Sequence, residues 1–264
     1  MTDRELVDFE VDPLNPGQFF ACCALLELAS RLWTGVEGRF DKTDRAFLLK
    51  MPGTRAELMT AIANAKLEPI DPDDVTSTPI RIGAPFRPLD IDWWVNDQTG
   101  ARDFKVWAGK MCSFEIAVAL QTSLRSEEFH NADTLNRGIV VRNPDDPSKK
   151  KEPYYFDSRR APNAHARDVG FSTDDADFAS IAHPAVELLC LIGLQTARPA
   201  STPVSRIYRY FTWHHLMPST LLLALACNAT ELPSGRCYEF ENWFRTGQRK
   251  HKSFRAASLV RNGE

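Results

Sequence analysis

The alternation of apolar and polar positions divides the chain into strands and helices. Residues 6–11 (LVDFEV) alternate as a half-buried strand does. Residues 15–33 differ, because apolar side chains cover most of the helix circumference and only Glu27, Ser30 and Arg31 are strongly polar. A helix that is apolar nearly all round is buried inside a domain. We therefore expect the N-terminal half to fold around this helix.

The start of this helix carries its own signals. Asn15 is able to cap it by accepting a backbone N–H of the first turn. Pro16 falls at the first helical position, where a missing N–H costs nothing. Gln18, three residues after the cap, is placed to reach back as in a capping box.

The first hundred residues contain more strands and one more helix. We predict strands at 38–40, 46–51, 80–82 and 89–95, and a helix at 54–67. Together with the first strand and helix, the order is β-α-β-β-α-β. The sequence predicts an α+β fold in which residues 1–100 form a ferredoxin-like or RRM-like unit.

Residues 101–264 mix apolar helical segments with alternating ones, which predicts a second, mixed region of helices and antiparallel strands with a basic C-terminal segment. The expected elements are helices at 105–124, from Ser172 and at 185–195, strands at 138–142 and 153–156, a solvated loop at 143–152, and a closing meander at 206–213, 216–226 and 237–244.

The composition is that of an ordinary globular protein, with 43% hydrophobic and 25% charged residues. No apolar run approaches the roughly 18 residues that span a bilayer, so we expect no membrane contact. The first twelve residues are acidic and lack the basic and apolar regions of a signal peptide. The sequence therefore predicts a cytoplasmic protein.

The charge is distributed unevenly along the chain. The formal net charge is −3, but residues 1–100 carry 10 basic and 17 acidic side chains, and residues 236–264 carry 7 basic and 3 acidic ones. An acidic front and a basic tail suit a protein that turns one face to a polyanion and another face elsewhere.

Candidate catalytic groups are sparse. The six cysteines include no C-x-x-C pair, the histidines are scattered, and no phosphate-binding glycine loop or nucleophile motif is present. We predict no cofactor, no metal site and no enzymatic activity. His214 and His215 are the residues that would serve a nuclease as general base or ligand, although only one of them can face a given pocket if they lie on a strand.

Two segments combine basic and aromatic residues, at 149–160 (KKKEPYYFDSRR) and 242–255 (NWFRTGQRKHKSFR). Arginine and lysine neutralise phosphates, while tyrosine, phenylalanine and tryptophan stack on exposed bases. The same aromatic residues also suit strand cores with the cations merely flanking them at the surface. Arg206 and Arg209 form a third candidate pair.

Four phrases resemble a known family. They are NPGQFFACCALLELASRLW at 15–33, LDIDWWVND at 89–97, FKVWAGKM at 104–111 and YYFDSRRAPNAHARDVGFS at 154–172. They resemble the small Csb-family subunit, a divergent large-subunit-like protein, of type I-G (formerly I-U) CRISPR–Cas effector complexes. The resemblance spans most of residues 15–172 and does not extend beyond Arg198.

The resemblance implies a non-catalytic subunit of a crRNA-guided surveillance complex in antiviral defence. Its partners would be the crRNA, target double-stranded DNA and the backbone and foot subunits, with a helicase–nuclease recruited separately. In such complexes base pairing reads the sequence, while protein reads backbone shape and a short duplex motif. The family phrases point at Trp93, Trp94, Trp107 and the segment 156–160.

The residues that we expect to contact nucleic acid are Lys105, Lys110, Lys149, Lys150, Lys151, Tyr155, Arg159, Arg160, Arg206, Arg209, Arg245, Arg249, Lys250, Lys252 and Arg255. Two alternatives stay open. One is a guide-processing or metal-dependent nuclease, and the other is a scaffold subunit that contacts only proteins.

Overall fold

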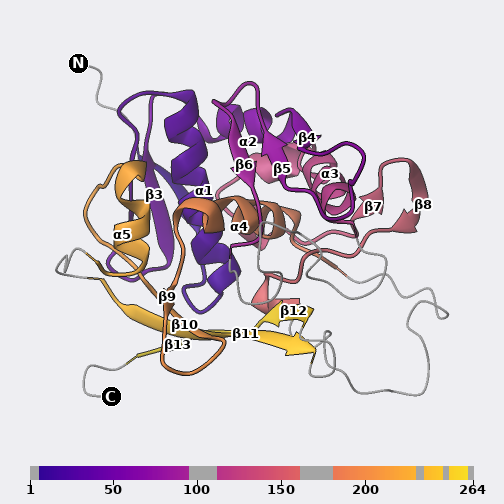
Figure 1. Cartoon of the computed structure of the whole chain (residues 1–264). Helices are drawn as coiled ribbons and strands as arrows, with labels where there is room; N and C mark the ends of the chain where they lie inside the picture. The colour runs from indigo at the N-terminus through magenta and orange to yellow at the C-terminus, as the bar shows by residue number, and fades with distance from the viewer. Residues whose placement is uncertain (1–5, 95–111, 161–180, 230–234, 246–249, 261–264) are drawn as a thin grey trace.

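The computed structural model describes residues 6–94, 112–160, 181–229, 235–245 and 250–260 (Figure 1). Its helices are α1 (Pro16–Leu32), α2 (Arg55–Ala63), α3 (Ser113–Ser123), η1 (Glu127–His130), η2 (Thr134–Asn136), α4 (Pro184–Thr196), η4 (Ser219–Leu221) and α5 (Leu222–Ala226). Its strands are β1 (Leu6–Glu10), β2 (Glu37–Phe40), β3 (Ala46–Lys50), β4 (Leu67–Pro69), β5 (Ile80–Ile82), β6 (Leu89–Ile91), β7 (Arg142–Asn143), β8 (Asp146–Lys150), β9 (Ala200–Ser201), β10 (Ile207–Phe211), β11 (Cys237–Arg245), β12 (Lys250–Phe254) and β13 (Ser258–Leu259). The predicted α+β class is confirmed.

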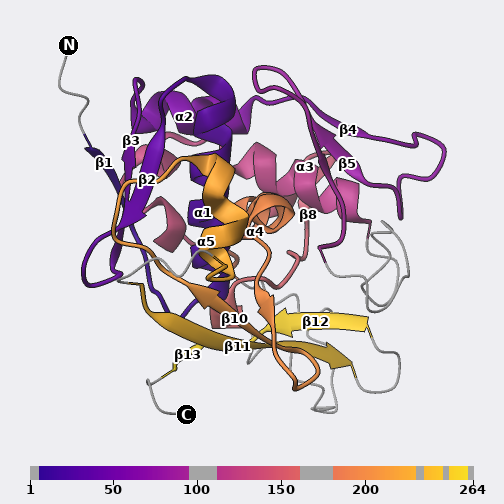
Figure 2. The same ribbon diagram turned by 60° about the vertical axis from the view of Figure 1, so that its left-hand side comes forward.

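Helix α1 lies at the centre of the molecule, as its apolar circumference predicts. Every residue from Pro16 to Ala29 is buried. Its neighbour is α4, another helix that is buried from Pro184 to Leu194 and comes from the second half of the chain. Figure 2 shows the two helices side by side between the sheets. One apolar core joins both halves, and a domain boundary at residue 100 stays a prediction.

The first sheet has the antiparallel order β1-β3-β2. A ferredoxin-like sheet needs a fourth strand beside β1; among the described residues no strand pairs there, so this part of the prediction is not confirmed. Arg55 of α2 donates to the Asp8 carbonyl at 2.7 and 3.1 Å, and the Glu10 N–H donates to Ala132 O. The outer edge of β1 is therefore occupied, and β4 pairs with β5 in a separate β4-β5-β6 sheet.

The opposite edge of the first sheet is closed by the C-terminal half. Gly38 and Met217 exchange two backbone hydrogen bonds, and the Phe40 N–H donates to Trp213 O at 2.9 Å. The indole N–H of Trp213 also donates to Gly38 O at 2.8 Å. Residues 213–217 thus act as an additional edge of β2.

Several predicted elements in the second half differ from the structure. The expected loop at 143–152 contains β8, which pairs with β7 in a hairpin. The expected strand at 216–226 contains η4 and α5, and the expected strand at 153–156 is irregular. The start of the 105–124 helix and the helix expected from Ser172 lie outside the described residues.

Asn15 caps α1 as predicted, but Gln18 does not bond back to the Asn15 N–H as it would in a capping box. The Asn15 side chain accepts from the Gly17 N–H at 3.1 Å. Gln18 instead accepts from the Asp12 N–H at 2.5 Å and donates to Leu135 O and Asn136 Oδ1. It therefore fastens the chain before α1 to the η2 segment.

Candidate nucleic-acid interface

The C-terminal sheet has the order β12-β11-β10-β9, with β13 also paired to β11. Along β10 and β11, the buried side chains are Tyr208, Tyr210, Tyr238 and Phe240. Tyr210 packs on Phe19 and Phe20 of α1, and Phe240 packs on Phe20. The alternate residues form the outer face of the sheet, because side chains alternate across a strand. Figure 1 shows this sheet along the lower side of the molecule.

One aromatic residue on the outer face is surrounded by cations. Trp243 is half-buried, with the Lys252 Nζ 4.9 Å and the Arg255 guanidinium 4.5 Å from its ring centroid. Arg255 also forms an ion pair with Glu241 at 2.9 Å. A register shift between Trp243 and Phe244 marks the β-bulge at this position. We call Trp243, Lys252 and Arg255 the tryptophan cluster.

The third predicted pair lies near the same face. Arg209 forms an ion pair with Glu239 on the neighbouring strand at 2.8 Å, so its charge is largely compensated. Arg206 has φ of 68° in the turn before β10, and its guanidinium lies 5.5 Å from the Phe244 ring centroid. Arg206 therefore contacts the buried residue that follows Trp243 in β11.

The three lysines of the 149–160 segment lie on or directly after β8. Lys149 is exposed and pairs with Asp146 at 2.9 Å, while Lys150 ends the strand. Lys151 is mostly covered and contacts the Glu115 carboxylate of α3. The protruding β7–β8 hairpin therefore presents Lys149 to solvent.

Tyr155 and Arg160 contact each other inside the protein. The Tyr155 hydroxyl donates to Glu152 at 2.6 Å, and the Arg160 guanidinium lies 5.0 Å from its ring centroid. Arg160 is 3% exposed, and it donates to Glu152 and to Ile181 O. In this conformation Arg160 has no surface for a phosphate, so its placement favours a structural role.

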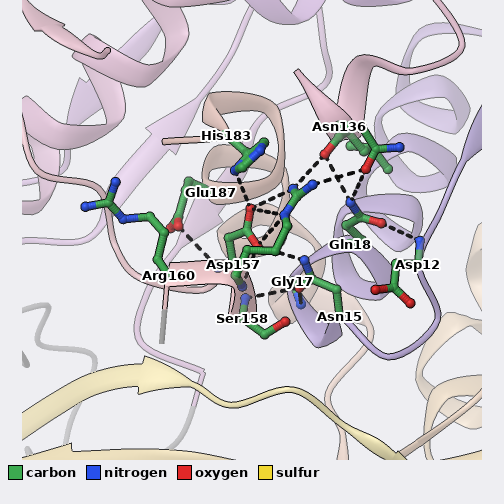
Figure 3. Close-up of polar contacts among 12 residues, drawn as sticks. Asp12, Asn15, Gly17, Gln18, Asn136, Asp157, Ser158, Arg160, His183 and Glu187 are labelled. Carbon is green, nitrogen blue, oxygen red and sulfur yellow. Dashed lines mark hydrogen bonds and ion pairs between the residues drawn. The ribbon is translucent and has the colours of Figure 1, made fainter. Parts of the chain in front are cut away.

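Arg159 belongs to a buried polar cluster around Asp157 (Figure 3). The Asp157 carboxylate is fully buried and accepts from Arg159 Nε at 2.9 Å and from Asn15 Nδ2 at 2.8 Å. His183, directly before α4, places Nδ1 2.8 Å from the same carboxylate. Desolvation opposes ionisation, but the hydrogen bonds from His183 and Arg159 prevail and hold the pKa of Asp157 well below its usual range.

Glu187 lies in the first turn of α4 and faces the 156–157 backbone. It is fully buried and accepts from the Phe156 and Asp157 N–H groups at 3.0 and 3.2 Å. Burial, followed by the Asp157 charge, raises the pKa of Glu187 to about 7, against the two N–H bonds and Arg160. The 156–160 segment is thus a junction between the starts of α1 and α4.

Two buried groups with shifted pKa values, His251 and Glu187, predict opposing effects of pH on stability. Burial lowers the pKa of His251 to about 3, so the unfolded chain binds its proton more tightly and stability falls as pH drops below about 6.5. Glu187 acts oppositely, because the folded state holds its proton more tightly between about pH 4.5 and about 7. In wild type the two effects oppose each other from pH 6.5 to 4.5.

The variant His251→Gln isolates the effect of Glu187. We expect its free energy of unfolding to rise on acidification from pH 7 to 5, by about 1 kcal/mol per pH unit. The free energy of unfolding of the wild-type protein should change little over the same range. Urea unfolding at pH 7, 6 and 5 measures this difference. A variant whose stability falls in parallel with wild type would contradict the assignment.

The remaining predicted residues divide into core residues and residues that the structure does not describe. Trp93 and Trp94 are buried and pack on Phe156 and Tyr208, respectively. Lys105, Trp107, Lys110 and Arg249 lie outside the described residues. Arg245 and Lys250 end β11 and begin β12, and their nucleic-acid contacts stay a prediction.

A second charged cluster was not predicted. The Asp44 carboxylate is fully buried and lies 2.7 Å from His214 Nε2, 2.8 Å from the Tyr238 hydroxyl and 3.0 Å from Arg236. Asp44 has φ of 62° in the β2–β3 turn. Asp44 and His214 are 170 residues apart, so no local sequence pattern indicates the pair.

Comparisons with protein-family models, curated proteins and solved structures find no match for this chain. In the part that the structure describes, no helix combines the length and apolar character needed to cross a membrane. Among the same residues, no group of three or more histidines, cysteines or acidic residues is arranged to hold a metal ion.

Proposed function

We propose that the protein is a non-catalytic, cytoplasmic nucleic-acid-binding subunit of a type I CRISPR crRNA-guided surveillance complex in antiviral defence. It contributes to guide RNA binding, to recognition of target duplex DNA and to assembly with neighbouring subunits. The resemblance of residues 15–172 to the Csb family supports the complex, and the tryptophan cluster supports the binding of nucleic acid.

The tryptophan cluster carries the proposal. Its two cations lie against the ring of a half-buried tryptophan on the outer face of the sheet. We propose that a base stacks on this ring while a phosphate meets Lys252. The 149–160 segment contributes less than its composition indicates, because Arg159 is paired with the buried Asp157 and the buried Arg160 is paired with Glu152. In the 149–160 segment Lys149 is the best-placed cation for a phosphate contact, and in the tryptophan cluster it is Lys252.

Two substitutions separate stacking from charge. We expect Trp243→Ala to weaken binding of single-stranded RNA by about 1–3 kcal/mol with an unchanged salt slope. Lys252→Glu should lower the magnitude of the slope of log K against log salt by about one unit, the contribution of one phosphate contact. Fluorescence titrations at two salt concentrations, on the isolated chain and on the assembled complex, measure both effects.

Arg125→Glu is the matched control, since Arg125 is exposed at the end of α3, on an element that is not part of the C-terminal sheet. It should bind RNA like wild type. If Trp243→Ala and Lys252→Glu also bind like wild type in both settings, the outer face of the sheet is not the nucleic-acid face, and the scaffold alternative leads.

One observation favours the nuclease alternative. A buried carboxylate that holds a histidine, as Asp44 holds His214, is the arrangement that orients a general base. The same RNA samples, incubated with Mg²⁺ or Mn²⁺, distinguish the two functions. Our proposal expects intact RNA, and cleavage that is lost in His214→Ala would replace it with the nuclease.

A further inference from the structure

The outer face of β11 carries two glutamates in one row with Trp243. Glu239, Glu241 and Trp243 follow one another at every second position, so their side chains point to the same side of the sheet. Each glutamate pairs with an arginine. Arg209, the cross-strand partner of Glu239 on β10, lies 2.8 Å from its carboxylate. Arg255, which follows β12, lies 2.9 Å from the Glu241 carboxylate. Both arginines are thus already matched by carboxylates of β11.

Arg255 is held between two groups. Its guanidinium lies 4.5 Å from the centroid of the Trp243 ring and contacts the Glu241 carboxylate. The side chain of Arg255 is nevertheless 46% exposed, and that of Glu241 is 26% exposed. A phosphate is therefore able to approach Arg255 from solvent, but it meets the negative charge of Glu241 there, and like charges repel. While Glu241 stays in place, Arg255 stabilises the ring and gains no phosphate.

Lys252 reaches the same ring by a different route. Trp243 pairs with Ser253 and Phe244 pairs with His251, so Lys252 is the extra residue of the β-bulge. A bulge turns a side chain away from the direction that regular alternation would give it. Here the Lys252 Nζ lies 4.9 Å from the centroid of the Trp243 ring. The two cations of the cluster are thus placed differently, one by the bulge and the other by an ion pair.

We propose that Glu241 limits the tryptophan cluster to one phosphate contact. This inference rests on the proposed function, in which a base of a single strand stacks on Trp243 and a phosphate meets Lys252. Glu241 keeps Arg255 engaged, so the bound strand gains no second contact from it. A second contact would strengthen the binding of every sequence alike and make binding more sensitive to salt. Glu241 is thus a positioning residue that leaves stacking on an exposed base as the larger share of the binding energy.

Fluorescence titration of the full chain with a single-stranded oligouridylate at several salt concentrations tests this role. We expect Glu241→Gln to bind about tenfold more tightly, because a charge-assisted contact through Arg255 becomes available. The slope of log K against log salt should increase in magnitude by about 0.7, the contribution of one phosphate of a single strand. Arg255→Gln alone should leave the wild-type slope unchanged. In Glu241→Gln/Arg255→Gln both gains should disappear, because Glu241 acts through Arg255.

Glu37→Gln is the matched control. Glu37 and Lys50 form an ion pair of 3.2 Å on the first sheet, with side chains 35% and 37% exposed, so the substitution removes the same charge from a comparable pair. It should bind like wild type, and circular dichroism verifies that all variants are folded. Wild-type affinity in Glu241→Gln would overturn the inference, and so would a gain that persists in the double variant or that Glu37→Gln shares. If Trp243→Ala and Lys252→Glu change binding as expected, such a result removes this inference alone; if they do not, the proposed function fails with it.

Discussion

Replacing Gly193 with alanine is expected to lower the free energy of unfolding by about 3–5 kcal/mol, among the larger effects of single substitutions. Gly193 lies where α4 meets α1. A Cβ there would overlap the Phe20 carbonyl oxygen and lie 3.1 Å from the Ala24 nitrogen. These are backbone atoms of a buried helix, so they cannot turn aside. Alanine favours the helix by only about 1 kcal/mol over glycine, and the steric overlap therefore dominates.

Gly83→Ala is the matched control. A Cβ at Gly83 would meet only Lys66 atoms, at 3.9 and 4.0 Å. Urea unfolding of both variants measures the difference. We expect the control to remain within about 1 kcal/mol of wild type. Equal stabilities for the two variants would mean that α1 and α4 do not pack as closely as the structure has them.

Asp157→Asn is expected to cost about 3–5 kcal/mol, the usual cost of breaking a buried ion pair by removing one partner. The substitution keeps the shape of the side chain but withdraws the charge that faces Arg159 and His183. It also places an amide donor among donors, since Asn15 Nδ2 and the Arg159 N–H both point at this carboxylate.

The pKa of Glu187 provides a second readout for this variant. The Asp157 charge is one of the two causes that raise this pKa to about 7, so the Glu187 carboxyl should titrate at lower pH in Asp157→Asn. NMR titration of the Glu187 carboxyl carbon measures the shift. Asp146→Asn, at an exposed ion pair, is the control and should change stability by less than about 1 kcal/mol. If the two variants are equally stable, Asp157 is not the ionic centre of the cluster.

Local sequence signals predicted the elements that they govern directly. Asn15 and Pro16 mark the start of α1, and its apolar circumference correctly predicted burial on all sides. The strands β1, β2 and β3 form close to the predicted positions. The short strand β8 was missed because its sequence, DPSKK, is polar and carries no alternation.

Sheet pairing and the polar clusters could not be predicted in the same way. Whether β4 joins β1 depends on Arg55 and Ala132, which occupy the edge from other elements. The basic residues at 159–160 resemble a phosphate-binding segment until Asp157 and Glu152 are seen to neutralise them. Composition records the cations, but only the fold assigns their partners.

The closure of β2 by residues 213–217 has a consequence for how the chain folds. While the protein is being synthesised, the N–H groups of Gly38 and Phe40 lack their carbonyl partners, which lie about 175 residues later in the chain. An unpaired strand edge is a template for association with other chains, and contacts between distant residues form slowly. The first sheet is therefore completed only after most of the chain has left the ribosome, and until then the nascent N-terminal half depends on late-arriving residues to protect its edge.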